Sequence, residues 1–313
     1  MTRELLVTPS PHIRSDGRTS KIMCMVILSL LPCLAVGTYL FGFRVLFVCL
    51  VCIGGAVIGE STVCKLTGKK LYISDMSALV TGLLLGLTLP AGLPLWQSFL
   101  GGIISTAVFK ESFGGLGKNP INPAIAARVL MLLSFGEMTE YSSPKSIDTV
   151  AGATPLKFLE DGNSFGIKEL FFGIRGGCTG EACILVILVG FIFLLAVKVI
   201  TPHTTFSFIG TAFLMSLLYE NGQIMLALEW CLAGSLIFGA VFMATDYVSS
   251  PTTRRGQIIY GILCGIFTCA IRFYGKYPEG VSFGILLANL TVPIIDVMTS
   301  KKVFGVKKSE KSI

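Results

Sequence analysis

Residues 22–43 read IMCMVILSLLPCLAVGTYLFGF, an apolar run without a charged side chain between Lys21 and Arg44. A helix rises about 1.5 Å per residue and the hydrocarbon core of a bilayer is about 30 Å thick, so a run of this length can cross it once. No small-residue cleavage pattern follows, so the run is interpreted as a retained membrane helix and not as a removable signal. The sequence therefore predicts a first transmembrane span here.

Similar runs recur along the rest of the chain. Hydrophobic residues make up 53% of the 313 residues and charged ones only 14%, which is too few polar side chains to coat a soluble body of this size. We expect an all-α integral membrane protein with about ten transmembrane helices, at 22–43, 44–60, 76–90, 92–110, 124–136, 182–200, 203–220, 224–245, 256–272 and 281–299. The third and fifth are short and lie beside prolines, a pattern typical of tilted or broken helices that line a cavity.

The basic residues indicate how the spans are oriented, because cytoplasmic loops carry the excess of Lys and Arg. If the N-terminus is inside, most of the 25 Lys and Arg fall on the cytoplasmic side. We therefore expect a protein of the inner (cytoplasmic) membrane with both termini in the cytoplasm and the long loop 137–181 outside. The net charge of +7 then comes mainly from basic residues on the cytoplasmic side, where they can contact anionic lipid headgroups. It gives no reason to expect nucleic-acid binding.

The long loop divides the chain into two membrane halves. The predicted parts are a cytoplasmic segment 1–21, a first half 22–136, the loop 137–181, a second half 182–299 and a basic tail 300–313. Five spans in each half would give the halves opposite orientations, as in inverted-repeat transporters. A Gly-Lys-x-Pro motif occurs twice, as GKNP before the last span of the first half and as GKYP before the last span of the second. This repetition agrees with two inverted five-helix repeats.

The ten cysteines do not predict a metal site. Most of them lie inside apolar runs, where cysteine behaves as a small hydrophobic residue. No Cys-x-x-Cys pair is backed by a second pair or by histidines, and the chain has only two His. We expect neither a zinc nor an iron–sulfur site built by this chain alone.

The long loop contains the segment DTVAGATPL, residues 148–156. Thr154 offers a hydroxyl that can be esterified, and Gly152 and Ala153 leave the backbone open to a modifying enzyme. The segment resembles the Ser/Thr-Gly-Ala-Thr flavinylation motif of the family that contains the Rnf D subunit and the B subunit of the sodium-translocating NADH:quinone reductase. In that family the threonine carries FMN through a phosphoester, which implies covalent FMN on Thr154, with Asp148, Gly152 and Ala153 beside it. The sequence departs from the motif at Ala151, where the family usually has Ser or Thr.

The resemblance extends over nearly the whole chain. It is carried by four further segments: DMSALVTGLLLGLTLP at 75–90, FGGLGKNPINPAIAARVLM at 113–131, FMATDYVSSPTTRRGQIIYG at 242–261 and YPEGVSFGILLANLTVPIID at 277–296. The length fits the Rnf branch of the family better than the quinone-reductase branch. The resemblance implies an electron-transfer subunit of a translocase complex that couples electron flow from ferredoxin to NAD to the movement of Na⁺ or H⁺.

The resemblance also implies the partners of such a subunit. These are the other membrane subunits, an extracytoplasmic flavoprotein subunit, and a flavin transferase during maturation. Ferredoxin and NAD are expected to bind partner subunits, because this chain has no Gly-x-Gly-x-x-Gly fingerprint and no iron–sulfur cysteine pattern.

A second, non-covalent flavin, riboflavin, is implied inside the membrane part. Asn119 and Asn122 could present amide groups to the edge of its isoalloxazine ring. The alternative is a helix entry, with Asn122 as N-cap and Pro123 at the first helical position. Arg128, further along that helix, is interpreted as a residue that snorkels to the interface or as a partner for a cofactor or an acidic group.

Four acidic residues at membrane depth or at span ends are candidates for an ion path, for buried pairing or for interfacial placement: Glu229, Asp75, Asp246 and Asp296. Glu279 is interpreted as part of a structural turn. Two other classes of function stay open, a solute or ion transporter without a redox role and a structural membrane anchor. Only the redox interpretation requires the motif at 148–154, because function belongs to sites and not to architectures.

Overall fold

A computed structural model describes residues 19–68, 75–139, 155–173, 176–275 and 279–300. Within these ranges the chain forms helices and connecting turns and no strand. The all-α prediction is confirmed.

The described part of the first half begins with two long apolar helices. They are separated by the turn at Gly42, whose φ of 95° suits a residue without a Cβ. The helices and short 3₁₀ turns of this half are α1 (Thr19–Phe41), α2 (Arg44–Leu66), α3 (Ser77–Thr88), α4 (Leu95–Ala107), η2 (Glu111–Phe113), α5 (Pro123–Ser134) and η3 (Gly136–Thr139).

Short elements in the described residues connect the halves: α6 (Pro155–Glu160), α7 (Ile167–Phe172) and η4 (Thr179–Glu181). The second half also combines long helices with short and broken ones. It consists of α8 (Ile184–Ala196), α9 (Pro202–Tyr219), α10 (Ile224–Leu232), α11 (Leu236–Phe238), the π-helical turn η5 (Gly239–Met243), α12 (Arg254–Tyr274) and α13 (Val281–Thr299).

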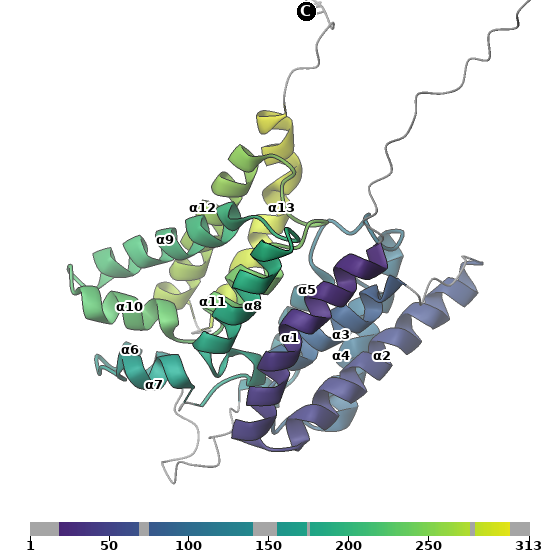
Figure 1. Ribbon diagram of the computed structural model, residues 1–313, viewed down its shortest axis with the longest axis horizontal. Helices are drawn as coiled ribbons and strands as arrows, with labels where there is room; N and C mark the ends of the chain where they lie inside the picture. Colours follow the sequence, from purple (N-terminus) through teal and green to yellow (C-terminus); the bar gives the residue numbers. More distant parts are fainter. Residues whose placement is uncertain (1–18, 69–74, 140–154, 174–175, 276–278, 301–313) are drawn as a thin grey trace, which may run out of the picture.

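The two halves form two groups of helices that meet along α1 and α8 (Figure 1). Within the groups, α2 packs mainly on α4, and α9 packs mainly on α12. The start of α1 and the end of α13 point toward the same edge of the view, whereas α6 and α7 lie near the lower edge (Figure 1). The division into five and five spans and the inverted orientation of the halves stay predictions.

Glycines allow the two main helix pairs to approach closely. A Cβ on Gly55 of α2 would overlap the backbone carbonyl of Phe99 in α4, and one on Gly102 of α4 would overlap that of Cys52. In the second half, a Cβ on Gly261 of α12 would overlap a side chain of α9. Small residues at such crossings are the usual packing device of membrane helices, because lipid gives helices no hydrophobic reason to associate.

Four described helices are long and apolar enough to cross a membrane: α1, α2, α12 and α13. A fifth span results if α10 and the α11–η5 helix, which are bent by 64° at a short break, are taken as one. The short third and fifth spans expected from the sequence are α3 and α5, each of 12 residues. At about 1.5 Å per residue they are too short to cross the hydrocarbon alone.

Several span boundaries differ from the prediction. The fourth and sixth spans, predicted at 92–110 and 182–200, correspond to α4 and α8, which have only 13 residues each. The sequence predicts that the second span ends at residue 60, but α2 continues to Leu66, and Glu60 within it is paired with Lys110 inside the protein. The eighth span, predicted at 224–245, is broken between Leu232 and Leu236, where Gly234 has a φ of 65°. A glycine with positive φ ends a helix without steric cost.

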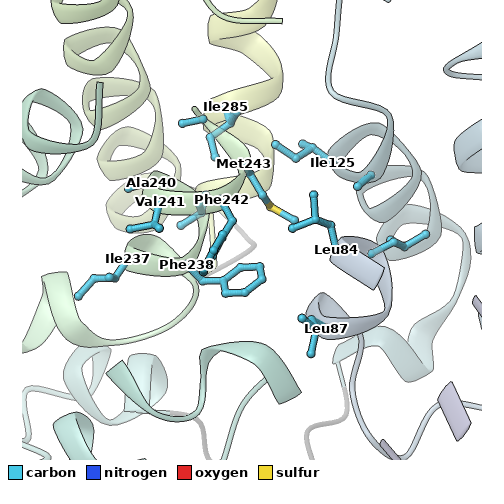
Figure 2. Close-up of a cluster of buried hydrophobic side chains, with 14 of the residues drawn as sticks. Leu84, Leu87, Ile125, Ile237, Phe238, Ala240, Val241, Phe242, Met243 and Ile285 are labelled. Carbon is cyan, nitrogen blue, oxygen red and sulfur yellow. The ribbon is translucent and has the colours of Figure 1, made fainter. Parts of the chain in front are cut away.

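Buried apolar side chains from both halves meet in one core. Figure 2 shows Leu84 and Leu87 of α3 facing Phe238, Phe242 and Met243, which lie at the end of α11 and in the π-helical turn. Ile125 of α5 and Ile285 of α13 belong to the same cluster (Figure 2). The broken helix of the second half is therefore packed directly against the short helices of the first.

Candidate functional site

A cavity of about 80 Å³ lies on one side of this core, between the two halves. Its walls come from α1, α3, α5, the end of α8 and η5, and from the connecting residues 110–122, 199–200 and 245–248, and most of the lining is apolar. The polar residues in the lining are Ser77, Thr81, Lys110, Asn119, Asn122, Thr245, Asp246 and Tyr247. The cavity combines apolar walls with a few polar groups, which is the usual character of a small-molecule site.

Asn122 forms the helix entry expected as the alternative interpretation. Its Oδ1 accepts hydrogen bonds from the backbone N–H of Ala124 at 3.0 Å and of Ile125 at 3.4 Å, and Pro123 opens α5. Its Nδ2 donates to the carbonyl of Met243 at 3.2 Å, which ties α5 to the π-helical turn. The N-cap interpretation is confirmed, and the same residue also lines the cavity.

Asn119 is buried and lines the cavity together with Asn122. Its Nδ2 donates to the carbonyl of Ile121 at 3.1 Å, so its amide stabilises the turn that leads into α5. Both asparagines therefore line one cavity, and their contact with a flavin stays a prediction.

A flavin ring fits the lining by chemistry, because amides and hydroxyls stand in an otherwise apolar wall. The volume of 80 Å³ is smaller than the roughly 300 Å³ at which ligand pockets usually begin. Tyr247 and Leu116 line the cavity and are exposed at the surface.

Lys110 is a feature of the cavity that sequence reasoning missed. Its Nζ lies 2.9 Å from Oε2 of Glu60 and 2.6 Å from Oγ of Ser77, and its side chain is almost completely buried. Asp75, a candidate from the sequence, accepts from the Oγ of Ser77 at 2.7 Å. A lysine at the end of a predicted span is typical of an interface residue, so only the fold reveals this buried ion pair.

Arg128 lies outside the cavity. It is 2% exposed and forms an ion pair with Glu279, and its Nη2 lies 3.2 Å from Sγ of Cys178. The snorkelling interpretation is therefore wrong and the acidic-partner interpretation is confirmed. The reason is that α5 is short and surrounded by protein, so the guanidinium cannot reach water and is neutralised by a carboxylate instead.

Cys178, Glu181 and Glu279 place a sulfur and two carboxylate oxygens within 4.8 Å of one another, a spacing that could hold a metal ion. The guanidinium of Arg128 already brings a positive charge to two of them. We therefore interpret the cluster as an ion-pair network that joins α5, η4 and the start of α13.

The acidic candidates near the ends of η5 and α13 have local partners. Asp246 accepts from Oγ of Ser249 at 2.9 Å and from the N–H of Val248 at 3.3 Å. Burial raises the pKa of the Asp246 carboxyl, and these two hydrogen bonds oppose the rise. Asp296 accepts from the N–H of Thr252 at 3.1 Å. Of the two, only Asp246 lines the cavity.

Glu229 is buried in α10 and accepts hydrogen bonds from Ser164 and Phe165 of the segment between the halves. Of the alternatives left open for it, buried pairing is the one observed. The motif residues Asp148, Gly152, Ala153 and Thr154 lie outside the described residues, and the description resumes at Pro155.

Comparison with known proteins gives the family. The model of the NQR2, RnfD, RnfE family matches residues 6–305. The chain is 41% identical to the D subunit of the Na(+)-translocating ferredoxin:NAD(+) oxidoreductase complex of Acetobacterium woodii, with 98% of this chain and 97% of that protein covered. It is 37% identical to the D subunit of the proton-translocating ferredoxin:NAD(+) oxidoreductase complex of Clostridium ljungdahlii, with 96% of each covered. It is 35% identical to the D subunit of an ion-translocating oxidoreductase complex of Shewanella amazonensis, with 96% and 97% covered.

The match to the family model covers nearly the whole chain, and it agrees with a fold that contains several helices able to cross a membrane. The protein is a multi-pass membrane protein that belongs to the NQR2, RnfD, RnfE family.

Proposed function

We propose that this chain is the D subunit of an Rnf-type complex and carries FMN covalently on Thr154. The observation that carries the proposal is its similarity, over almost its full length, to relatives that are named as D subunits of such complexes. The segment DTVAGATPL supplies the acceptor threonine. A flavin exchanges electrons singly or in pairs, which suits a relay between carriers of different kinds.

In this proposal the complex couples electron transfer from ferredoxin to NAD to the movement of Na⁺ or H⁺ across the inner membrane. The names of the relatives from Acetobacterium woodii and Clostridium ljungdahlii contain different ions, so they do not select one for this chain. Ferredoxin and NAD bind other subunits, and an extracytoplasmic flavoprotein subunit exchanges electrons with the flavin on Thr154.

The arrangement of the helices supports the proposed topology. The start of α1 and the end of α13 point to one edge of the molecule, as expected if both termini are cytoplasmic (Figure 1). The helices α6 and α7, which follow Thr154, lie toward the other edge, as expected for an extracytoplasmic flavin loop (Figure 1). Asn119 and Asn122 line the cavity in which a second, non-covalent flavin would bind.

The proposal is tested by replacing Thr154 with Ala in the complex of the native host. Membranes from this variant should lose most of the ferredoxin-dependent reduction of NAD while the complex still assembles. Thr149→Ala, which removes another hydroxyl of the same segment, is the matched control and should keep the activity. Full activity of the Thr154→Ala complex would contradict the proposal.

A further inference from the structure

The segment that follows Thr154 is docked on the second half of the membrane domain. Pro155, which a peptide bond joins to Thr154, begins α6 and is buried. The buried leucines of α6 and α7 form a separate cluster with the end of α10, made of Leu156, Leu159, Leu170, Trp230 and Ala233. These apolar contacts hold residues 155–172 against one helix end.

A polar contact reinforces the docking. Oε1 of Glu229 accepts from Oγ of Ser164 at 2.6 Å, and Oε2 accepts from the N–H of Phe165 at 3.0 Å. Glu229 is only 3% exposed. Burying a carboxylate is costly unless donors satisfy its oxygens, and here two donors come from the docked segment. Undocking would remove these hydrogen bonds from Glu229, so the docked arrangement is favoured.

The docking place is the break of the bent helix. Leu156 lies over Gly234, since a Cβ added there would be 2.8 Å from Cδ1 of Leu156. Arg272 of α12 holds the end of α10: Nη1 donates to the carbonyl of Trp230 at 2.7 Å and Nη2 to that of Ala233 at 3.1 Å. The last carbonyls of a helix lack N–H donors within the helix, so the guanidinium of Arg272 caps this end of α10.

We infer that Glu229 is a positioning residue that fixes the flavin-bearing segment on the end of α10. A group esterified to Thr154 would then be tethered, through the peptide bond to Pro155, to a docked helix. The inference rests on the proposed function, because the flavin is the group that is positioned. It concerns no reacting atom, so Glu229 acts through residues 155–172.

The first test measures the docking without reference to the flavin. The full-length chain in lipid nanodiscs is treated with trypsin, and mass spectrometry follows the peptides produced by cleavage after Lys157 and Lys168, which are exposed in the docked segment. Glu229→Ala should raise the rate of cleavage after Lys157 and the rate after Lys168 about tenfold, because cleavage inside short helices requires local opening. Glu160→Gln, which changes an exposed carboxylate at the end of α6, is the control and should be cleaved at the wild-type rate. Rates for Glu229→Ala that stay within about twofold of wild type would overturn the inference.

The second test measures the position of the flavin. Time-resolved fluorescence anisotropy of the covalent flavin should gain a fast component in Glu229→Ala and not in Glu160→Gln. Glu229→Gln, which keeps one acceptor oxygen, should fall between the two. Faster cleavage with unchanged anisotropy would show a purely structural role and would overturn the positioning role.

The flavin content of the wild-type chain tests the proposed function, and the cleavage rates test the role of Glu229. A wild-type chain without flavin would contradict the proposed function, while the cleavage rates would still decide whether Glu229 holds the segment. If Glu229→Ala does not fold, Ser164→Ala removes one donor to the same carboxylate from an exposed residue. Ser164→Ala is then expected to raise the two cleavage rates about threefold, and wild-type rates would overturn the inference.

Discussion

At the scale of single residues, buried ion pairs are costly to break. Arg128 and Glu279 come from opposite halves of the chain and neutralise each other in a place that water hardly reaches. Removing one partner of such a pair leaves the other charge buried, whereas removing both avoids this penalty. The pair therefore joins the halves electrostatically.

We predict that Glu279→Gln lowers the free energy of unfolding by about 3–5 kcal/mol, because the Arg128 guanidinium stays buried beside a neutral partner. The double variant Arg128→Met with Glu279→Gln should lose clearly less than the sum of the two single variants. Thermal unfolding in detergent measures the loss of stability in Glu279→Gln, in Arg128→Met and in the double variant. Strictly additive losses would contradict the assignment of a direct pair.

Asp246 leads to a prediction about pH. Burial raises its pKa above the ordinary value of 3.8, so the folded state favours the neutral carboxyl. Well below pH 3.8 the carboxyl is protonated in both states, and as pH rises toward the raised pKa the folded state loses stability relative to the unfolded state. Asp246→Asn, which stays neutral, should therefore gain melting temperature relative to wild type as pH rises from about 4 to about 7. A difference that shrinks over this range would contradict the raised pKa.

At the scale of elements, close packing of α2 on α4 depends on glycine. Gly55 has no room for a side chain, whereas a Cβ on its neighbour Gly54 would meet nothing within 4 Å. We predict that Gly55→Ala destabilises the protein by about 1–3 kcal/mol through overpacking. Gly54→Ala, on the same helix, should leave stability unchanged or raise it by no more than about 1 kcal/mol. Equal effects of the two variants in thermal unfolding would contradict the packing.

The elements also show what could be predicted from the sequence. The length of the apolar runs identifies α1, α12 and α13, and the Asn-Pro pattern identifies the start of α5. Hydropathy does not report a bend, so it misses the break at Gly234 inside the apolar run 224–245. The burial of Lys110 and the particular partner of Arg128 also escape prediction, because the carboxylates that neutralise them lie far away in the sequence.

At the scale of the whole molecule, the family, the cavity and the docked segment fit one arrangement. Short helices of one half meet a broken helix of the other at a buried apolar core (Figure 2). The cavity lined by Asn119 and Asn122 lies beside this core, and residues 155–172 are docked on α10, whose break leads into the same core. If the proposed function is right, the cavity and the docked segment are where cofactors would be held.

The proposed attachment of FMN to Thr154 can be measured by peptide-level mass spectrometry of the chain purified from a host with a flavin transferase. We predict that the peptide containing Thr154 gains the mass of one FMN less water and that the Thr154→Ala chain shows no such gain. An unmodified Thr154 in the presence of a competent transferase would contradict this attachment.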